Sequence, residues 1–232
     1  MLPLFDAHSH LPNPDAPSPG QGQVICGTCE ADWAAVLSHA AADPRIIPML
    51  GLHPWFVAEA SPNWAPHLEA QLRSHRAGVG ECGLDFSRRH ADRAGQISAF
   101  RLQLRLAHDL GRPLAMHIVQ AWGSLLDLIQ AEGVPQAGAM IHDFSGSVEM
   151  ALTLQGLGIF LSFSGALLKP ERQKLREALR AAAPERLLLE TDGASDLAHV
   201  LEVAADIRGA SVDDLATQTW ENGRRCFKEC LA

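Results

Sequence analysis

The chain has 232 residues, of which 47% are hydrophobic and 20% are charged. This composition supplies a sizeable buried core and excludes an intrinsically disordered chain. Nineteen Lys and Arg residues stand against 27 Asp and Glu residues, and the formal net charge of −8 at pH 7 excludes the broad basic surface of a non-specific duplex binder. A nucleic acid substrate would therefore have to be held locally, by a cleft or a metal.

Short apolar runs with β propensity alternate with longer amphipathic stretches along the chain. The eight predicted strands are Pro3–Ala7, Gln23–Thr28, Ile46–Leu52, Gly78–Leu84, Pro113–His117, Ala139–His142, Gly158–Phe163 and Arg186–Glu190. The predicted helices are Ala31–Ala42, Asn63–His75, Asp92–Leu110, Ala121–Glu132, Val148–Gly156, Pro170–Ala182, Asp196–Ile207 and Val212–Leu231. Repeated βα units of this kind form parallel sheets. We therefore predict an α/β protein with a (β/α)8 TIM barrel, with a doubly wound open sheet as the alternative.

The organisation of the chain is simple. No stretch resembles an interdomain linker, so residues 1–232 are predicted to form one domain, with the Pro-rich segment Leu11–Gly20 as a loop after the first strand. No apolar run approaches 18 residues, and we find no charged-then-apolar leader. The odd count of five cysteines argues against a disulfide framework. We expect a cytoplasmic protein without a membrane partner; the oligomeric state stays open, with a monomer favoured.

Ionisable side chains close or interrupt most of the predicted strands. They are Asp6, His8, His10, His53, Glu81, Asp85, His117, His142 and Asp192. In a (β/α)8 barrel the carboxyl ends of all strands share one face, which is where active sites are built. We therefore expect these residues to converge on one cavity. Ionisable groups inside apolar runs are costly to bury without a partner, and that cost points to a binding site.

The types of these residues indicate a metal site. His8 and His10 are two residues apart, so on a continuing strand both rings point to the same side and can bind one cation. Four histidines with two or three carboxylates suit Zn, Mn or Mg, and six ligands are more than one tetrahedral ion needs. Two ions about 3.5–4 Å apart can activate a water and clamp a phosphodiester. The alternative is a set of structural histidines and capping carboxylates.

Five strings of residues occur in an order that resembles a known family. They are Phe5–His10, Gly51–Pro54, Gly80–Asp85, His142–Ser147 and Glu190–Asp192, and Asn222–Phe227 resembles the C-terminal signature of the same family. Together they closely resemble the TatD family of metal-dependent hydrolases, from residue 5 to residue 227. The resemblance implies a (β/α)8 barrel that uses divalent metals, and several members of the family are deoxyribonucleases, including enzymes that remove nucleotides from a 3′ end.

The resemblance also implies roles for residues of this chain. One ion is held by His8, His10 and Asp192, a second by His117 and His142, and Glu81 bridges both. Glu81 and Asp192 are the implied catalytic residues. In the family scheme a metal-activated water attacks phosphorus, and Asp192 is placed to take up or return the proton of that water. His53 resembles a substrate-facing position, although a histidine that only caps its strand before Pro54 fits equally well. Asp85 and Asp6 are expected to anchor neighbouring groups.

The chain departs from the family pattern on the substrate side. The family usually follows the histidine of the fifth strand with a small residue and then an arginine, whereas this chain has Ile118-Val119-Gln120. The Asp-Ala-Pro of the family is Asp192-Gly193-Ala194 here. Metal chemistry is thus expected to be intact and substrate recognition altered. Trp55 follows His53 and Pro54 on a strand-end loop, and it is the tryptophan we expect to stack on a substrate.

These observations predict a two-metal hydrolase that cleaves phosphodiester bonds, most directly in DNA, from a 3′ end or within a single strand. One alternative keeps the metals and assigns another ester or amide, such as an aminoacyl ester on tRNA or a small molecule, because the same activated water serves all of these. A second alternative is a metal-binding protein without catalytic activity. The sequence does not choose among Zn, Mg and Mn.

Overall fold

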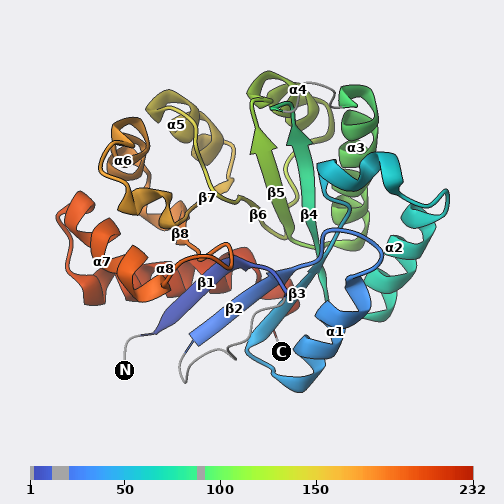
Figure 1. The fold of residues 1–232 in the computed structure, drawn as a ribbon, viewed down its shortest axis with the longest axis horizontal. Coiled ribbons are helices and arrows are strands. Elements are labelled where there is room, and N and C mark those ends of the chain that lie inside the picture. Colours follow the sequence, from blue (N-terminus) through green and yellow to red (C-terminus); the bar gives the residue numbers. More distant parts are fainter. Residues whose placement is uncertain (1–2, 12–20, 88–91, 232) are drawn as a thin grey trace.

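The computed structural model describes residues 3–11, 21–87 and 92–231, and it contains one sheet of eight parallel strands in the order β1 to β8 (Figure 1). The strands are β1 (Leu4–Ser9), β2 (Gln21–Cys26), β3 (Ile46–Leu50), β4 (Gly78–Asp85), β5 (Leu114–Val119), β6 (Ala139–Ile141), β7 (Phe160–Phe163) and β8 (Leu187–Leu189). Every strand predicted from the sequence is present. The predicted loop over residues 12–20 lies outside the described residues.

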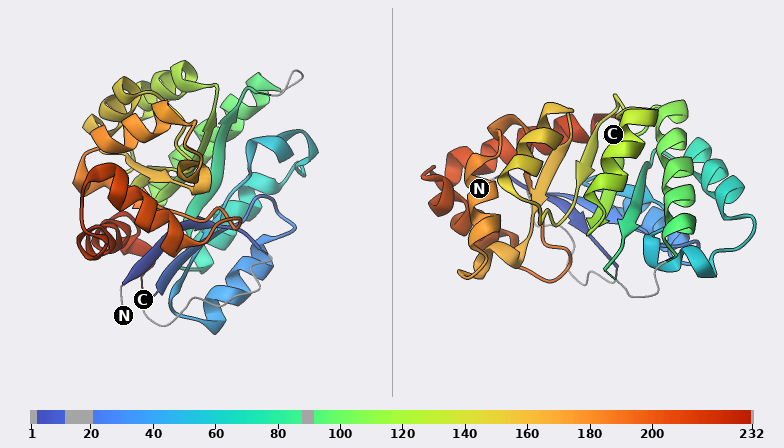
Figure 2. Two further views of the ribbon diagram at one scale, coloured as in Figure 1. Left: turned by 60° about the vertical axis from the view of Figure 1, so that its left-hand side comes forward. Right: turned by 90° about the horizontal axis from the view of Figure 1, so that it is seen from above.

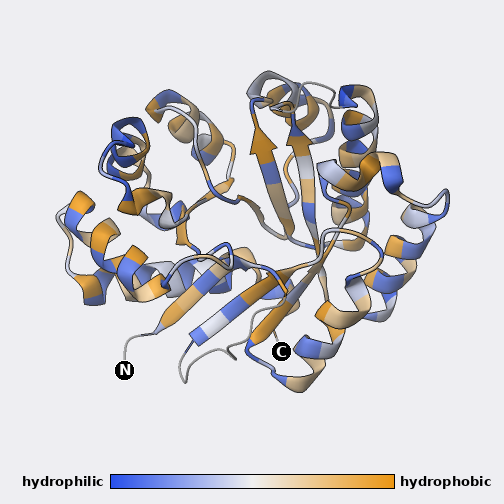
Figure 3. Ribbon diagram, viewed as in Figure 1, coloured by the Kyte–Doolittle hydropathy of each residue, from blue (hydrophilic) through white to orange (hydrophobic). Residues whose placement is uncertain are grey.

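The described residues contain eight α-helices, which cover the outside of the curved sheet (Figure 2). From β2 onward each strand is followed by a helix, and two helices follow β8. They are α1 (Trp33–Ala42), α2 (Trp64–Ser74), α3 (Arg93–Leu110), α4 (Trp122–Glu132), α5 (Val148–Gly156), α6 (Gln173–Ala181), α7 (Leu197–Arg208) and α8 (Val212–Cys226). Side-chain caps fix several starts: Ser147 accepts from Met150 N, and Asp92 accepts from Gly95 N. Bands of hydrophobic and hydrophilic residues alternate along the helices, as amphipathic helices require (Figure 3).

The sheet curves into a nearly closed barrel whose seam lies between β8 and β1. The backbone N–H of Asp192 donates to the carbonyl of His8 at 3.0 Å. The backbone N–H and the hydroxyl of Thr191 both donate to the Asp6 carboxylate, at 2.9 and 2.7 Å. Burial outweighs these hydrogen bonds and raises the pKa of Asp6 to about 7. The fold is therefore a (β/α)8 barrel, and the alternative of a doubly wound open sheet is wrong.

Two apolar layers hold the barrel together. The larger one lies between the strands and the helices and includes Leu50, Leu84 and Phe163. The smaller one includes Met140 from β6 and Leu188 from β8, with residues from β1, β2, β3, β5 and β7. Because the barrel interior is filled by side chains rather than by a pore, polar groups can gather at the strand ends without opening a channel. In the described residues, no helix is both long and apolar enough to cross a membrane.

The predicted last helix, Val212–Leu231, is wrong at its end. Helix α8 stops at Cys226, and the chain continues into a short 3₁₀ helix, η4 (Lys228–Cys230). The break occurs because Phe227 is fully buried in the smaller apolar layer, where its ring stacks on Phe5 with centroids 6.0 Å apart. Cys226 and Cys230 thus do not lie on one continuous helix.

Three further 3₁₀ helices are absent from the predicted pattern: η1 (Pro54–Glu59), η2 (Gly165–Leu168) and η3 (Pro184–Arg186). Helix α6 also begins three residues after the predicted Pro170, because residues 169–172 form a separate turn closed by the hydrogen bond from Arg172 N to Lys169 O. Such short turns carry little hydrophobic periodicity, so the sequence pattern does not reveal them.

Burial predicts the reactivity of the five free thiols. Cys26, Cys82, Cys226 and Cys230 are buried, whereas Cys29 is partly exposed. Burial raises the pKa of Cys230 to about 12 and raises the pKa of Cys226 further, so both stay neutral and unreactive up to at least pH 10. We expect a disulfide reagent to titrate one thiol per native chain at pH 8 and five in denaturant. Rapid reaction of two or more native thiols at pH 8 would contradict this burial pattern.

Candidate metal centre

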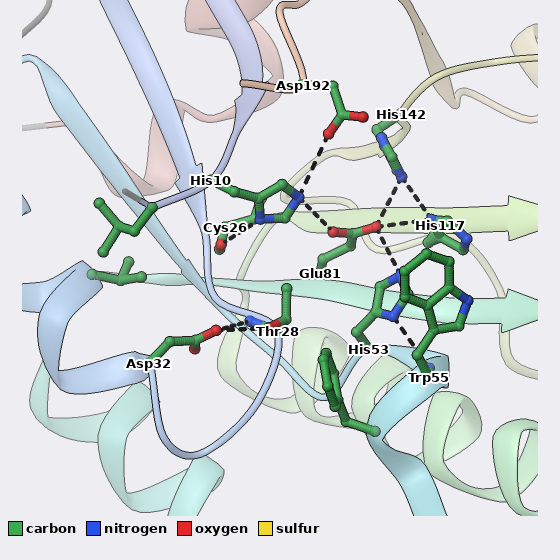
Figure 4. A pocket seen from close by; sticks show the side chains of 13 residues that line it. His10, Cys26, Thr28, Asp32, His53, Trp55, Glu81, His117, His142 and Asp192 are labelled. Atoms are coloured by element: carbon green, nitrogen blue, oxygen red, sulfur yellow. Dashed lines mark hydrogen bonds and ion pairs between the residues drawn. The ribbon is translucent and has the colours of Figure 1, made fainter. Parts of the chain in front are cut away.

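The six predicted ligands meet at the carboxyl ends of the strands. His8 lies in β1, Glu81 in β4 and His117 in β5. His10, His142 and Asp192 follow β1, β6 and β8. All of them except His8 line a cavity of about 420 Å³, and His8 is fully buried within 4 Å of Glu81 and Asp192. Figure 4 shows the five members that line the cavity, with Glu81 at their centre.

The two oxygens of Glu81 face two different sets of nitrogens. Oε2 lies 3.4 Å from His8 Nε2 and 3.0 Å from His10 Nε2. Oε1 lies 2.9 Å from His117 Nδ1 and 2.8 Å from His142 Nε2. Because one carboxylate reaches both sets, it has the geometry of a group that can bridge two cations. The structure thus brings together the residues that the sequence predicts.

The histidine hydrogen bonds fix which ring nitrogens face the cluster. Nδ1 of His10 lies 2.9 Å from the carbonyl oxygen of Cys26, so Nδ1 is the donor and the lone pair of Nε2 points to Glu81. Nδ1 of His8 lies 3.4 Å from Cys26 Sγ, which leaves His8 Nε2 only 3.0 Å from His10 Nε2. A divalent cation bound between these nitrogens and the carboxylate would accept their lone pairs and balance the negative charge.

Asp85 performs the anchoring role predicted for it. Its Oδ2 lies 3.3 Å from Nε2 of His117, so the other nitrogen of that ring, Nδ1, is turned to Glu81. The same Oδ2 accepts a hydrogen bond from Trp55 Nε1 at 2.6 Å, and Oδ1 accepts from the backbone N–H of Ser87. Burial opposes ionisation, but these hydrogen bonds outweigh it and lower the pKa of Asp85 to about 2.

Glu190 is a member of the cluster that the strand-end pattern did not single out. It is fully buried behind His142, with Oε1 3.4 Å from His142 Nδ1 and hydrogen-bonded to the backbone N–H of Asp143 at 2.7 Å. Its position turns His142 Nε2 towards Glu81, as a carboxylate behind a ligand histidine does. Glu190 ends the apolar run of β8 two residues before Asp192. The signal that selected Asp192 could therefore have selected it too.

The electrostatics of the cluster favour an ionised Glu81. Burial alone would raise its pKa, but the surrounding histidines, His142 first, outweigh burial and hold the pKa of Glu81 well below its usual range. Burial lowers the pKa of His8 to about 3, so this ring is neutral and able to donate its lone pair. Burial also raises the pKa of Asp192. An anionic centre ringed by nitrogens is suited to a divalent cation.

Local backbone geometry positions two of these residues. Asp192 has φ of 50°, a left-handed conformation that is uncommon outside glycine and concentrated at functional sites. Its backbone is held there by the bond to His8 at the seam. In β4, Gly83 has φ of 145°, and a side chain at this position would collide with the carbonyl of His117. The glycine therefore permits the close approach of β4 and β5 that brings Glu81 to His117.

His53 both caps a turn and faces the cavity. Its Nδ1 accepts a hydrogen bond from the backbone N–H of Trp55 at 3.2 Å, at the start of η1. A neutral ring therefore carries its proton on Nε2, which lies 3.3 Å from Glu81 Oε1. His53 is thus arranged as a hydrogen-bond donor into the cavity rather than as a lone-pair ligand. Both roles considered for it from the sequence have a geometric counterpart.

In the part of the chain that the structure describes, three groups of ligand atoms are each close enough to hold an ion, with all atoms of a group within 4.8 Å of one another. They are His8 with His10 and Glu81, His8 with His142 and Asp192, and His53 with Glu81 and His117. The first group contains three of the four ligands predicted for one ion, without Asp192. The other two divide the same cluster differently, because His8 and His142 stack with ring centroids 4.0 Å apart. The donor set fits a divalent metal, and these distances alone leave the number of ions open.

The two departures from the family pattern lie at the edge of the site. Ile118 is buried, whereas Gln120 is exposed with φ of 52° and does not line the cavity. Gly193 follows Asp192 with φ of 68°. Among the described lining residues none is a Lys or Arg. In the described part of the cavity wall, the side chains that could contact an anionic substrate through nitrogen are therefore histidines.

A cluster of histidine and carboxylate donors at the carboxyl ends of a parallel (β/α)8 barrel defines a metal-dependent hydrolase. Comparison with known proteins identifies which one. The chain belongs to the TatD family: the family of TatD related DNases matches residues 5–228, nearly the whole chain. The alternative of a metal-binding protein without catalytic activity is therefore not supported.

Named relatives agree with this assignment. A protein of Edwardsiella piscicida named 3′-5′ ssDNA/RNA exonuclease TatD is 32% identical, over 89% of this chain and 88% of its own length. A relative of the same name in Erwinia tasmaniensis is 30% identical over the same shares. Among solved structures, a TatD homologue of Escherichia coli superposes with a TM-score of 0.88 at 24% identity, covering 98% of both chains. At that identity the structural match establishes the fold.

Proposed function

We propose that this hydrolase removes nucleotides from the 3′ end of single-stranded nucleic acid, DNA in the first place. The observation that carries the proposal is the position of Glu81 between two sets of histidine nitrogens, which suits a two-ion phosphodiesterase. The names of the relatives support a nuclease over an esterase for aminoacyl-tRNA or small molecules. The −8 net charge favours capture of a strand end over binding along a duplex.

The proposed ligands are divided between two divalent ions, Zn, Mg or Mn. His8, His10 and Asp192 would hold one ion, His117 and His142 would hold the other, and Glu81 lies close enough to both sets to be a shared ligand. Such ions lower the pKa of water and neutralise charge on a phosphodiester. Cys26, Asp85 and Glu190 orient the rings of His10, His117 and His142. These outer contacts preorganise the histidines before metal or substrate arrives.

Asp192 and His53 are the proposed groups for proton transfer and substrate contact. The side chain of Asp192 is 40% exposed, far more than that of Glu81 at 2%, so Asp192 is the carboxylate that solvent and substrate can reach. It accepts the proton of the attacking water and can pass it to bulk solvent. His53 directs its Nε2 proton into the cavity and can donate to a phosphate oxygen.

The experiment that tests the proposed function uses a single-stranded oligonucleotide labelled at either end. Protein stripped by chelation should not cleave, and Mg²⁺, Mn²⁺ or Zn²⁺ should restore cleavage that proceeds from the 3′ end. Equal loss of label from both ends would refute the polarity. Turnover of an aminoacyl ester or small ester, without cleavage of the oligonucleotide under any metal, would refute the nuclease function itself.

Three further properties belong to the same proposal. Residues 1–232 act as one catalytic domain, since ligands from β1 and from the end of β8 complete one cluster. The protein works in the cytoplasm, where five free cysteines stay reduced. A monomer would suffice for the activity, because the proposed ligands all come from one chain.

A further inference from the structure

Trp55 stands out on the wall of the cavity. It lies in η1, lines the cavity beside His53, and is 45% exposed. Among the described residues, only Leu152 and Leu157 are comparably exposed large hydrophobic side chains, and both are remote from the site, at α5. A single exposed hydrophobic residue is common on protein surfaces. What sets Trp55 apart is therefore the way its side chain is held.

The indole of Trp55 is exposed but fixed. Its Nε1 donates a 2.6 Å hydrogen bond to Oδ2 of Asp85, whose side chain is buried. The ring also makes an edge-to-face contact with His53, with centroids 5.0 Å apart and planes at 83°. A side chain anchored in this way loses little conformational entropy when a ligand covers it. Trp55 thus presents a preorganised aromatic surface to the cavity.

This aromatic surface lies next to the proposed ions. Asp85 Oδ2, which anchors Trp55, lies 3.3 Å from His117 Nε2, and the rings of Trp55 and His117 have centroids 6.1 Å apart. Figure 4 shows Trp55 beside His53 and His117 on one side of Glu81. A nucleotide whose phosphate is bound by the proposed ions would carry its base only a few ångströms away. The indole is within reach of that base.

The chemistry of the remaining wall favours stacking as a source of affinity. The described lining residues include no Lys or Arg, and Val119 stands at the position after His117 and Ile118 where the family pattern would have an arginine. Beyond the proposed ions, the described wall offers Leu11, Val36 and Phe56 beside Trp55. Stacking on an aromatic ring is tolerant of base identity and does not depend on phosphate charge.

We propose that Trp55 is the substrate-binding residue on which a nucleobase next to the scissile phosphate stacks. The proposal rests on the proposed nuclease function and deepens it. It assigns recognition of the strand end to a base rather than to the phosphate backbone. The site would then accept any of the four bases and discriminate against a strand end that lacks one.

The test combines a change in the protein with a change in the substrate. Trp55→Ala is expected to raise KM for a single-stranded oligonucleotide about 10-fold, since loss of one stacked base costs roughly that factor, and Trp55→Phe by less than about threefold. Placing an abasic residue on one or the other side of the terminal scissile phosphate should raise the wild-type KM similarly at one of these positions. On that substrate Trp55→Ala should have less than a twofold effect.

Controls separate stacking from electrostatic attraction and from loss of metal. Leu152→Ala, an exposed residue of α5, should leave KM unchanged, and Trp55→Ala should retain the metal content of the wild type. The effect of Trp55→Ala should be equal at 50 and 200 mM salt, because stacking is not electrostatic. The proposal would be overturned if Trp55→Ala raised KM as much on both abasic substrates as on the intact oligonucleotide. Loss of metal from Trp55→Ala would also overturn it. Absence of cleavage by the wild type would instead refute the proposed function.

Discussion

Replacing Glu81 with alanine is expected to lower kcat by about 10⁴-fold and to reduce the metal content from the proposed two ions per chain to at most one. The reason is that Oε1 and Oε2 contact separate sets of histidines, so both proposed ions lose an anionic ligand at once. Each ion stabilises the charge of the transition state by several kcal/mol. Each 1.4 kcal/mol of activation free energy changes the rate by about tenfold. Single-turnover cleavage and elemental analysis of dialysed protein measure the two effects.

The control for this substitution must distinguish loss of metal binding and activity from unfolding of the protein. Glu81→Gln keeps the volume of the buried side chain and one carbonyl oxygen, and we expect the same loss of metal and activity with little change in the melting temperature of the metal-free protein. Glu69→Gln, on the exposed side of α2, should behave as the wild type. Two ions per chain together with kcat within tenfold of the wild type would show that Glu81 does not bridge.

Much of the fold could be predicted from the sequence because the glycines and prolines that end helices agree in position with the hydrophobic periodicity. Gly111-Arg112-Pro113 ends α3 and starts β5, with Gly111 in the left-handed conformation expected of a helix C-terminus. The predicted bounds of α5 coincide with the observed ones. Local signals of this kind are read within a few residues, so they do not depend on knowing the tertiary structure. The predicted convergence of strand ends follows from topology alone.

Features that depend on contacts between distant segments could not be predicted. The seam is joined by Asp6 and Thr191, which are 185 residues apart, and nothing in either local sequence identifies the partner. The end of α8 is set by the burial of Phe227 in the smaller apolar layer, although the sequence after Cys226 remains compatible with a helix. That Nδ1 of His53 caps η1 could be seen only from the position of the Trp55 backbone. Tertiary packing decides all three.

Asp192→Asn is expected to lower kcat by about 10²–10⁴-fold, the usual contribution of a general base, while at least one ion remains bound. The change removes one negative charge and the proton acceptor but keeps the size of the side chain. Since Oδ1 of Asp192 lies 3.6 Å from His10 Nε2 and 3.8 Å from His8 Nε2, the two histidines and Glu81 should still hold metal. The loss should therefore appear in kcat more than in metal content or KM.

The pH dependence distinguishes a proton acceptor from a simple ligand. If Asp192 accepts the proton, the variant should lose the acidic limb of the wild-type kcat profile, and its residual rate should rise with hydroxide concentration. Asp206→Asn, an exposed carboxylate on α7, should keep the wild-type profile. An Asp192→Asn variant with an unchanged acidic limb, or with kcat within threefold of the wild type, would remove Asp192 from proton transfer and leave the exposed side of the cavity without a base.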